Sequence, residues 1–262
     1  MITLTMKIID AAGEIKAERS GDSRVELCYL EEYQEGDKIV LTASQYPVHL
    51  YCQVDDVLRG CLCYLTEDLV YKVPFGERTT VYSKRAFTGL RHFLFARTAE
   101  EFELANYRNL ALNVNDQHRV EGCYPHADAN VETRGEAVFE AKNAIDGCYG
   151  NYSHGTWPFA SWGINRDPNA CMTLKFGRPV EIDRLGICLR ADFPHDSYWT
   201  EGTVTFSDGS VEVLKFEKTN RTQYFSIAPR KIEWLTFDKL IKADDESPFP
   251  ALTQMEVWGK DI

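Results

Sequence analysis

The stretch Thr203–Phe216, TVTFSDGSVEVLKF, determines the fold class expected of this chain. Apolar residues alternate with polar ones on both sides of Ser207–Ser210, and a period of two is the pattern of a half-buried β-strand. Asp208 and Gly209 suit a tight primed or bulged turn, because Gly adopts the positive φ that such turns require. The stretch therefore predicts an antiparallel hairpin.

Other runs of the same kind extend in both directions from this hairpin. In the C-terminal half they predict strands at Met172–Phe176, Ile182–Leu189, Thr222–Ile227, Ile232–Phe237 and Met255–Trp258. In the N-terminal half they predict strands at Met1–Ile9, Ser23–Leu30, Asp37–Ser44, Val48–Val54, Gly60–Leu65 and Arg91–Arg97. Short strands separated by turn residues are typical of antiparallel sandwiches. Long helical periodicity is absent.

The pattern changes near Asn106, which marks the expected domain boundary. We expect an all-β protein of two tandem antiparallel β-sandwiches: residues 1–106, of unassigned role, and residues 107–262. Just before the boundary, Thr98 and Glu101 have capping-box spacing and favour a helix start. Phe102 and Leu104 suit a strand equally well, so both alternatives stay open.

The charge of the chain bears on its partners. The 262 residues carry a formal net charge of -11 and contain no Lys- or Arg-rich run. Nucleic-acid backbones and anionic membrane surfaces are repelled by such a charge, so neither is an expected partner. The first ten residues lack a signal-peptide pattern, and no apolar run reaches the roughly 20 residues of a membrane helix. We expect a cytoplasmic protein by default, or a trimmed secreted one.

Eight cysteines are spread along the chain without zinc-ligand spacing. An even number permits disulfides, but buried free thiols are expected in a chain of this length that lacks a secretion signal.

The segment Asn143–Asn165, NAIDGCYGNYSHGTWPFASWGIN, is the main candidate for function. It combines turn-forming residues with a His, two Trp, a Phe and three Asn, so it predicts a long surface loop rather than a regular ladder. Aromatic and amide side chains on such a loop are typical of a binding surface. We expect Trp162, at the far end of the loop, to return into the core, and Trp258 to be a core residue as well.

Several short motifs in the second half resemble one family when taken in order. They are Asn109-Leu-Ala-Leu, Asn143-Ala-Ile-Asp-Gly147, Trp162, Leu174-Lys-Phe-Gly177, Val180–Leu185, the Ser207-Asp-Gly-Ser hairpin and Met255-Glu-Val-Trp-Gly259. In this order they resemble the discoidin, or coagulation factor 5/8 type C, domains, including bacterial galactose-binding-like carbohydrate-binding modules. The resemblance covers roughly Asn109–Gly259. It implies an eight-stranded jelly roll whose rim loops hold the ligand.

The same resemblance implies a structural Ca²⁺ at the turn and the last strand. Hard cations of this kind take six to eight oxygen ligands from a tight loop. The matching carboxylates are Asp146 and Glu256, with Asn143 and Ser153 as further oxygen donors. The alternative is that Asp146 caps its own turn and Glu256 is a surface residue of the strand.

Family members that bind galactose place a His and an aromatic residue on one loop and an Arg and an acidic residue on the next. Sugar C–H groups stack on aromatic rings, and hydroxyls bond to charged or amide groups. The residues that match or adjoin this pattern are His154, Trp157, Arg190, Asp196, Tyr198 and Trp199. Each has a structural alternative: a loop staple for Trp157, a loop histidine for His154, a salt bridge for Arg190 and the core for Trp199. Arg134 and Glu136 are further candidates for the same rim.

These observations favour a non-catalytic carbohydrate-binding protein whose partner is a glycan or small sugar. The sequence lacks the motifs of nucleophilic hydrolases and of phosphate-binding loops. Two alternatives remain. The same rim loops can bind a protein partner, since Trp and Tyr serve protein interfaces equally well. A glycoside hydrolase needs two facing carboxylates, for which Asp192, Asp196 and Glu201 are available.

Overall fold

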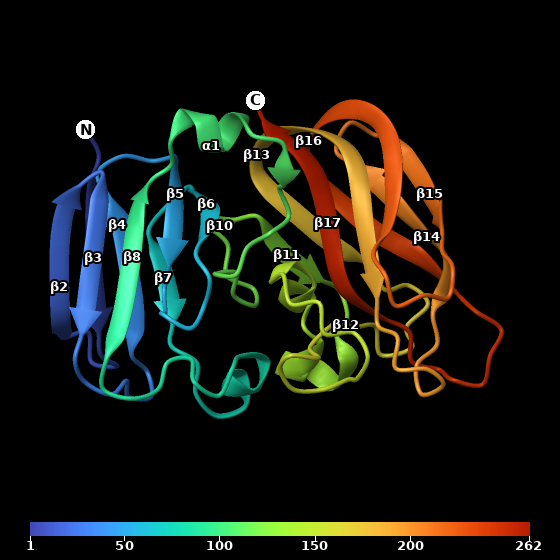
Figure 1. The fold of residues 1–262 in the computed structure, drawn as a ribbon, viewed down its shortest axis with the longest axis horizontal. Coiled ribbons are helices and arrows are strands. Elements are labelled where there is room, and N and C mark those ends of the chain that lie inside the picture. Colours follow the sequence, from blue (N-terminus) through green and yellow to red (C-terminus); the bar gives the residue numbers. More distant parts are fainter.

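The computed structural model describes residues 1–262 and shows two β-sandwiches side by side (Figure 1). Every strand pair is antiparallel, which confirms the all-β, antiparallel expectation. No helix is long and apolar enough to cross a membrane. The sandwiches have separate hydrophobic clusters, one built mainly from residues before Leu110 and one from Leu110 onward. The boundary at residue 106 stays a prediction.

The first sandwich packs a sheet of order β2-β1-β4-β7 against one of order β10-β6-β5-β8-β3. A 3-10 helix, η1 (Gly76–Val81), lies between β7 and β8 in the sequence. The strands are β1 (Thr3–Ile9), β2 (Ile15–Asp22), β3 (Arg24–Tyr29), β4 (Lys38–Ala43), β5 (Val48–Gln53), β6 (Cys61–Leu65), β7 (Leu69–Lys72), β8 (His92–Thr98) and β10 (Cys123–Tyr124).

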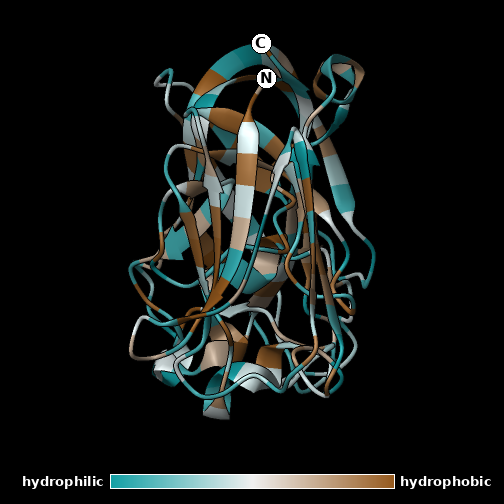
Figure 2. Cartoon of the chain, turned by 90° about the vertical axis from the view of Figure 1, so that its left-hand side faces the viewer, coloured by the Kyte–Doolittle hydropathy of each residue, from teal (hydrophilic) through white to brown (hydrophobic).

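Six of these nine strands coincide with the runs expected from the sequence, whereas β2, β7 and the two-residue β10 were missed. Strand β2 is an edge strand with no buried residue, so it has no hydrophobic alternation to detect. Strand β7 has only four residues. Along the strands that were predicted, hydrophobic and hydrophilic residues alternate, as Figure 2 shows by colour.

The second sandwich is formed by an eight-stranded sheet of order β12-β17-β13-β16-β14-β15, with β11 added to β13 and β9 to β17. Its strands are β9 (Arg108–Asn109), β11 (His126–Ala129), β12 (Trp162–Gly163), β13 (Met172–Leu189), β14 (Trp199–Phe206), β15 (Val211–Lys215), β16 (Gln223–Lys242) and β17 (Ala251–Asp261). Its helices are α1 (Glu101–Ala105) at the entry and the 3-10 helices η2 (Thr133–Gly135), η3 (Ala137–Phe139) and η4 (Ala141–Ile145).

The opening hairpin forms as expected, from β14 and β15. Its turn is of the bulged kind, because Phe206 and Ser210 are joined by a backbone hydrogen bond of 3.0 Å and Gly209 has a φ of 83°. In two places, two consecutive predicted strands form one continuous strand: β13 and β16 each span two of the predicted runs. Gly177 and Pro179 shift the register of β13 without ending it, since β-bulges absorb extra residues within a ladder.

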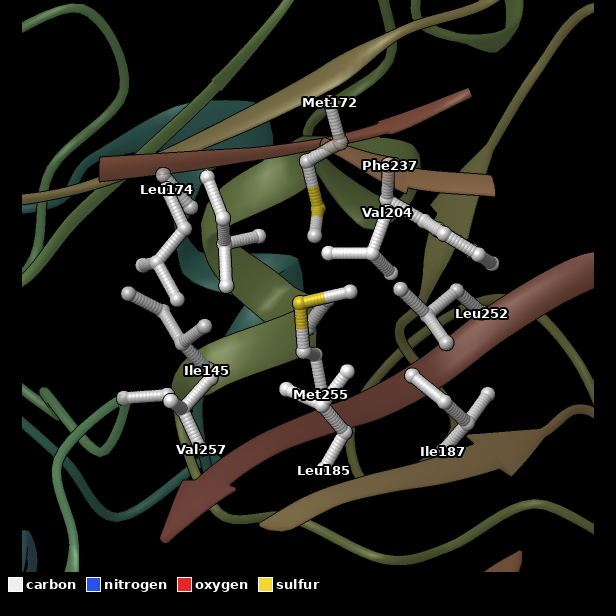
Figure 3. Packing of buried hydrophobic residues seen from close by; sticks show 14 of the residues in the cluster. Ile145, Met172, Leu174, Leu185, Ile187, Val204, Phe237, Leu252, Met255 and Val257 are labelled. Atoms are coloured by element: carbon white, nitrogen blue, oxygen red, sulfur yellow. The ribbon is translucent and has the colours of Figure 1, made fainter. Parts of the chain in front are cut away.

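The core of the second sandwich lies between the faces of these long strands. Met172 and Met255 occupy its centre among branched aliphatic side chains (Figure 3). Trp162 is fully buried there, as expected. Trp258 is not a core residue: it is partly exposed, stacks on Tyr107 with ring centroids 5.9 Å apart, and donates from its indole nitrogen to Glu256 Oε2 at 2.6 Å.

The segment that links the sandwiches is held in the first one by buried polar groups. Asn113 and Asn115 form hydrogen bonds with the thiols of Cys61 and Cys63, including one of 3.2 Å from Asn115 Nδ2 to Cys61 Sγ. The contact with Cys63 and burial raise the pKa of Cys61 well above its usual range, and the contact with Cys123 and burial do the same for Cys63, so both thiols stay protonated at neutral pH. All eight cysteines are free thiols in the structure.

Helix α1 is short and begins differently from the expectation. The capping box is formed by Glu100 and Glu103, because Thr98 still belongs to β8. Glu103 accepts two hydrogen bonds from the guanidinium of Arg97, at 2.6 and 2.7 Å, and one from the backbone of Glu100 at 2.9 Å. The hydrogen bonds from Arg97 lower the pKa of Glu103 to about 2, although burial opposes the shift.

We predict that Glu103→Gln lowers the free energy of unfolding by about 1–2 kcal/mol at pH 7, because a charge-assisted bidentate pair is lost. The stabilisation from the depressed pKa is fully present above the unfolded value of about 4.3 and is lost as the pH falls through the folded value of about 2. The difference from the unmodified protein should therefore shrink as the pH falls from 5 to 2 in urea titrations. The exposed Glu101→Gln is the matched control, and a difference independent of pH would contradict the account.

Candidate functional site

The segment 143–165 divides into a buried start, an exposed middle and a buried end. Asn143 is fully buried and Asp146 half-buried, Tyr152 and His154 are exposed, and Trp162 is fully buried. The expectation of one long loop is therefore correct only for the middle of the segment. Residues 141–145 form η4 instead.

The start of this segment is fixed to β17 by a single amide. Gln254 Nε2 donates to Asn143 O at 2.6 Å and to Asp146 Oδ1 at 2.8 Å, and its Oε1 accepts from the backbone of Gly147 at 2.8 Å. Gln254 Nε2 also donates to the carbonyl oxygen of Thr253 at 2.6 Å. Three oxygens thus converge on one amide nitrogen.

This arrangement does not fit the Ca²⁺ site that the resemblance implies. Glu256 does not face Asp146: its Oε1 accepts from Tyr149 Oη and its Oε2 from the Trp258 indole, both at 2.6 Å. The side chain of Asn143 is bonded to Ala137 O, and Ser153 forms no hydrogen bond with the group. The point where the oxygens meet is filled by the amide of Gln254.

The charge around Asp146 also disfavours a divalent cation. Desolvation raises the pKa of Asp146 to about 6, and the nearby positive charges of Lys142 and Arg59 act in the opposite direction. Arg59 also donates to the adjacent Gly147 O at 3.4 Å. A cation at this turn would meet two positive side chains and a carboxylate that is partly protonated near neutral pH.

We predict that EDTA leaves the thermal unfolding curve of the protein unchanged. Gln254→Ala should lower the free energy of unfolding by about 2–4 kcal/mol, because it leaves several buried backbone groups and Asp146 without partners. Differential scanning calorimetry with and without EDTA and added Ca²⁺ measures both effects. A melting temperature that falls with EDTA and recovers with Ca²⁺ would contradict the fit described above.

At the rim of the second sandwich, His154 belongs to a column of stacked groups. Its ring is 4.2 Å from that of His195, which is 5.5 Å from the ring of Phe249. The guanidinium of Arg166 lies over the Phe249 ring, 4.8 Å from its centroid. His154 Nδ1 is 3.1 Å from Asp192 Oδ2, which orients the first ring.

The column forms one wall of a hollow of about 490 Å³. The other wall comes from the η2 region and from the backbone after β12, including Thr133, Arg134 and Asn165. Asn165 and Arg166 have φ values of 49° and 60°. Non-glycine residues in the left-handed region cost free energy and cluster at ligand sites. The hollow therefore combines aromatic rings, amide and guanidinium groups on locally strained backbone.

Arg190 and Asp196 form a buried ion pair that fixes the segments bordering the hollow. Both are almost completely buried, and Arg190 donates to Asp196 Oδ1 through Nε at 2.9 Å and Nη2 at 2.6 Å. Arg190 also donates to Phe249 O at 3.1 Å, and Asp196 Oδ2 accepts from the backbone of Asp192 at 2.9 Å. Of the two, Arg190 lines the hollow and Asp196 supports it.

The other expected ligand residues lie elsewhere. Trp199 is fully buried, 6.3 Å from the ring of Trp162, so it has no face to offer a ligand and that expectation is corrected. Tyr198 packs against the core and Phe193. Trp157 does not line the hollow beside His154: it is 44 % exposed, its backbone nitrogen donates to Thr80 O at 2.7 Å, and it borders a separate small cavity with Leu58 and Tyr82.

Sequence reasoning missed Phe249, Asn165 and Arg166. Phe249 is 37 % exposed and lies between two prolines just before β17. A large aromatic residue in a Pro-Phe-Pro segment is a signal that could have been noticed, because such a segment cannot pair in a sheet and leaves its ring at the surface. Asn165 and Arg166 show no comparable pattern, since the sequence does not reveal their positive φ.

Several solved structures that resemble this chain are carbohydrate-binding modules. A chitosan-binding module from the chitosanase/glucanase of Paenibacillus sp. IK-5 is 18% identical over 59% of this chain and 100% of its own, with a TM-score of 0.39. The family 32 module of C. perfringens NanJ in complex with galactose is 17% identical over 50% and 91%, with a TM-score of 0.38. A fucose-binding module of Streptococcus pneumoniae is 14% identical over 57% and 96%, with a TM-score of 0.41. No protein-family model and no curated protein sequence matches the chain.

Proposed function

We propose that this chain is a non-catalytic glycan-binding protein and that the hollow beside His154 and Phe249 is its binding site. The observation that carries the proposal is the column of His154, His195, Phe249 and Arg166 along a hollow of about 490 Å³. This volume lies in the range of ordinary small-molecule sites, roughly 300–1,000 Å³.

The chemistry of the walls suits a sugar. A pyranose has an apolar patch of C–H groups that packs on aromatic rings. The exposed His154 and the exposed part of Phe249 border the hollow and provide apolar surface, while His195 stacks on both rings and Arg166 lies over Phe249. Its hydroxyls need a few fixed partners, which the Asn165 amide, the Arg166 guanidinium and His154 Nε2 supply, while His154 Nδ1 is paired with Asp192. Arg190 is committed to Asp196, so its role is to position Phe249 rather than to bind hydroxyls.

The composition of the hollow supports binding over hydrolysis. Glycoside hydrolysis ordinarily uses two carboxylates on either side of the scissile bond, whereas no Asp or Glu lines this hollow. Asp196, one of the carboxylates considered for a hydrolase, is buried in its ion pair with Arg190. A protein partner would be supported instead if the chain bound no glycan but bound a protein through the same loops.

We predict that Phe249→Ala weakens glycan binding by about 1–2 kcal/mol, roughly five- to thirtyfold in Kd, without unfolding the domain. A glycan array with the full chain identifies the strongest ligand, and calorimetry with that glycan measures the loss. Phe193→Ala is the matched control, because Phe193 lies on a neighbouring loop outside the hollow and contacts Lys218 and Tyr198. Equal binding by the folded Phe249→Ala variant would exclude the hollow as the site.

A further inference from the structure

A second hollow, of about 410 Å³, lies between the two sandwiches. Residues 35–38 and 72–75 with Arg78, Val81 and Tyr82 form one side, and Gln117, His118, Val120 and Lys142 form the other. It shares no residue with the hollow beside His154 and Phe249, which we call the rim hollow. A site of this size at the junction of two domains is a common location for a small-molecule ligand.

The lining of this junction hollow is basic, although the chain as a whole has a net charge of -11. Lys38, Lys72, Arg78 and Lys142 line it, against the carboxylates Glu35 and Asp37 only. Two of these groups are neutralised elsewhere. Asp37 accepts from Lys16 at 2.8 Å, and Arg78 is paired with Glu140. Three lysines remain to face the hollow, with one exposed glutamate.

Lys142 is the most unusual of them. Its residue is 8% exposed, and its ammonium, which has three N–H donors, forms only one hydrogen bond, at 3.3 Å to Asn143 Oδ1. Its remaining contact is with the face of Tyr82, 5.2 Å from the ring centroid. Buried ammonium groups are costly unless their donors find partners. Lys142 thus has unused donors where the hollow meets the protein interior.

The charge of Lys142 is maintained despite its burial. Desolvation acts to lower its pKa, but Tyr82 and the carboxylates of Glu140, Asp146 and Asp116 outweigh it, and the pKa is raised. None of these carboxylates lies within ion-pair distance of the ammonium. Glu140 is compensated by Arg78 and Asp116 by His126, so the charge of Lys142 is not cancelled by a direct partner.

We propose that the junction hollow is a second binding site, for a small organic anion whose carboxylate or phosphate group lies against Lys142 and the lysines at positions 38 and 72. The ring or apolar body of the ligand packs on Phe75 and Tyr82, which supply the aromatic part of the lining. Negative charge complements the lysines, and a flat body suits the aromatic walls. Because both sandwiches contribute, the bound anion also links them.

The test is a calorimetric titration of the full chain with glucuronate, glucose 6-phosphate and inorganic phosphate, with glucose as the neutral control. We expect saturable binding of at least one of the two ring-bearing anions and none of glucose. Binding should weaken about tenfold or more in Lys142→Met, because a hydrogen-bonded charge is removed. Inorganic phosphate should bind more weakly than glucose 6-phosphate, since it lacks the ring.

Two further variants keep the test decisive if Lys142→Met fails to fold. Lys38 and Lys72 lie nearer the surface, so the double variant Lys38→Ala/Lys72→Ala should fold and should weaken binding by about three- to tenfold. The exposed Lys231→Ala, on β16, is the matched control and should bind as the unmodified chain does. The proposal is overturned if no anion binds, if glucose binds equally well, or if folded variants at positions 38, 72 and 142 keep full affinity.

Discussion

The buried ion pair between Arg190 and Asp196 is the interaction on which the rim of the second sandwich depends. It connects the end of β13, the loop that carries His195, and the segment that carries Phe249. Breaking such a pair by removing one partner leaves an uncompensated buried charge and costs about 3–5 kcal/mol. The pair therefore positions the segments that carry His195 and Phe249, whose side chains border the hollow.

A second constraint acts on the other side of the loop. The amide of Gln254 gathers the oxygens of Asn143, Asp146 and Thr253, and thereby fixes the turn that precedes His154. A neutral amide performs here the task that a bound cation would perform in a site rich in carboxylates. The rim is consequently shaped by hydrogen bonds of Gln254 and by the Arg190–Asp196 ion pair.

The sequence predicted the fold better than the site. Alternation revealed most strands, but it could not show that Gly177 and Pro179 bend β13 without ending it, nor reveal the polar edge strand β2. For the candidate site, residue types at loop positions drew attention to His154 and Arg190, which line the same hollow. They could not distinguish the buried Trp199 from an exposed ring, because exposure depends on how distant strands pack. Phe249 was missed because it reaches the rim from a segment over ninety residues away from His154.

The most direct test of the account is the response of the histidine rings to a glycan. The ring signals of His154 and His195 can be followed by NMR while the glycan that binds best on an array is added. If the rim hollow is the binding site, both signals shift along one saturable curve whose midpoint equals the Kd from calorimetry. Saturable glycan binding that leaves both rings unperturbed would contradict the central claim.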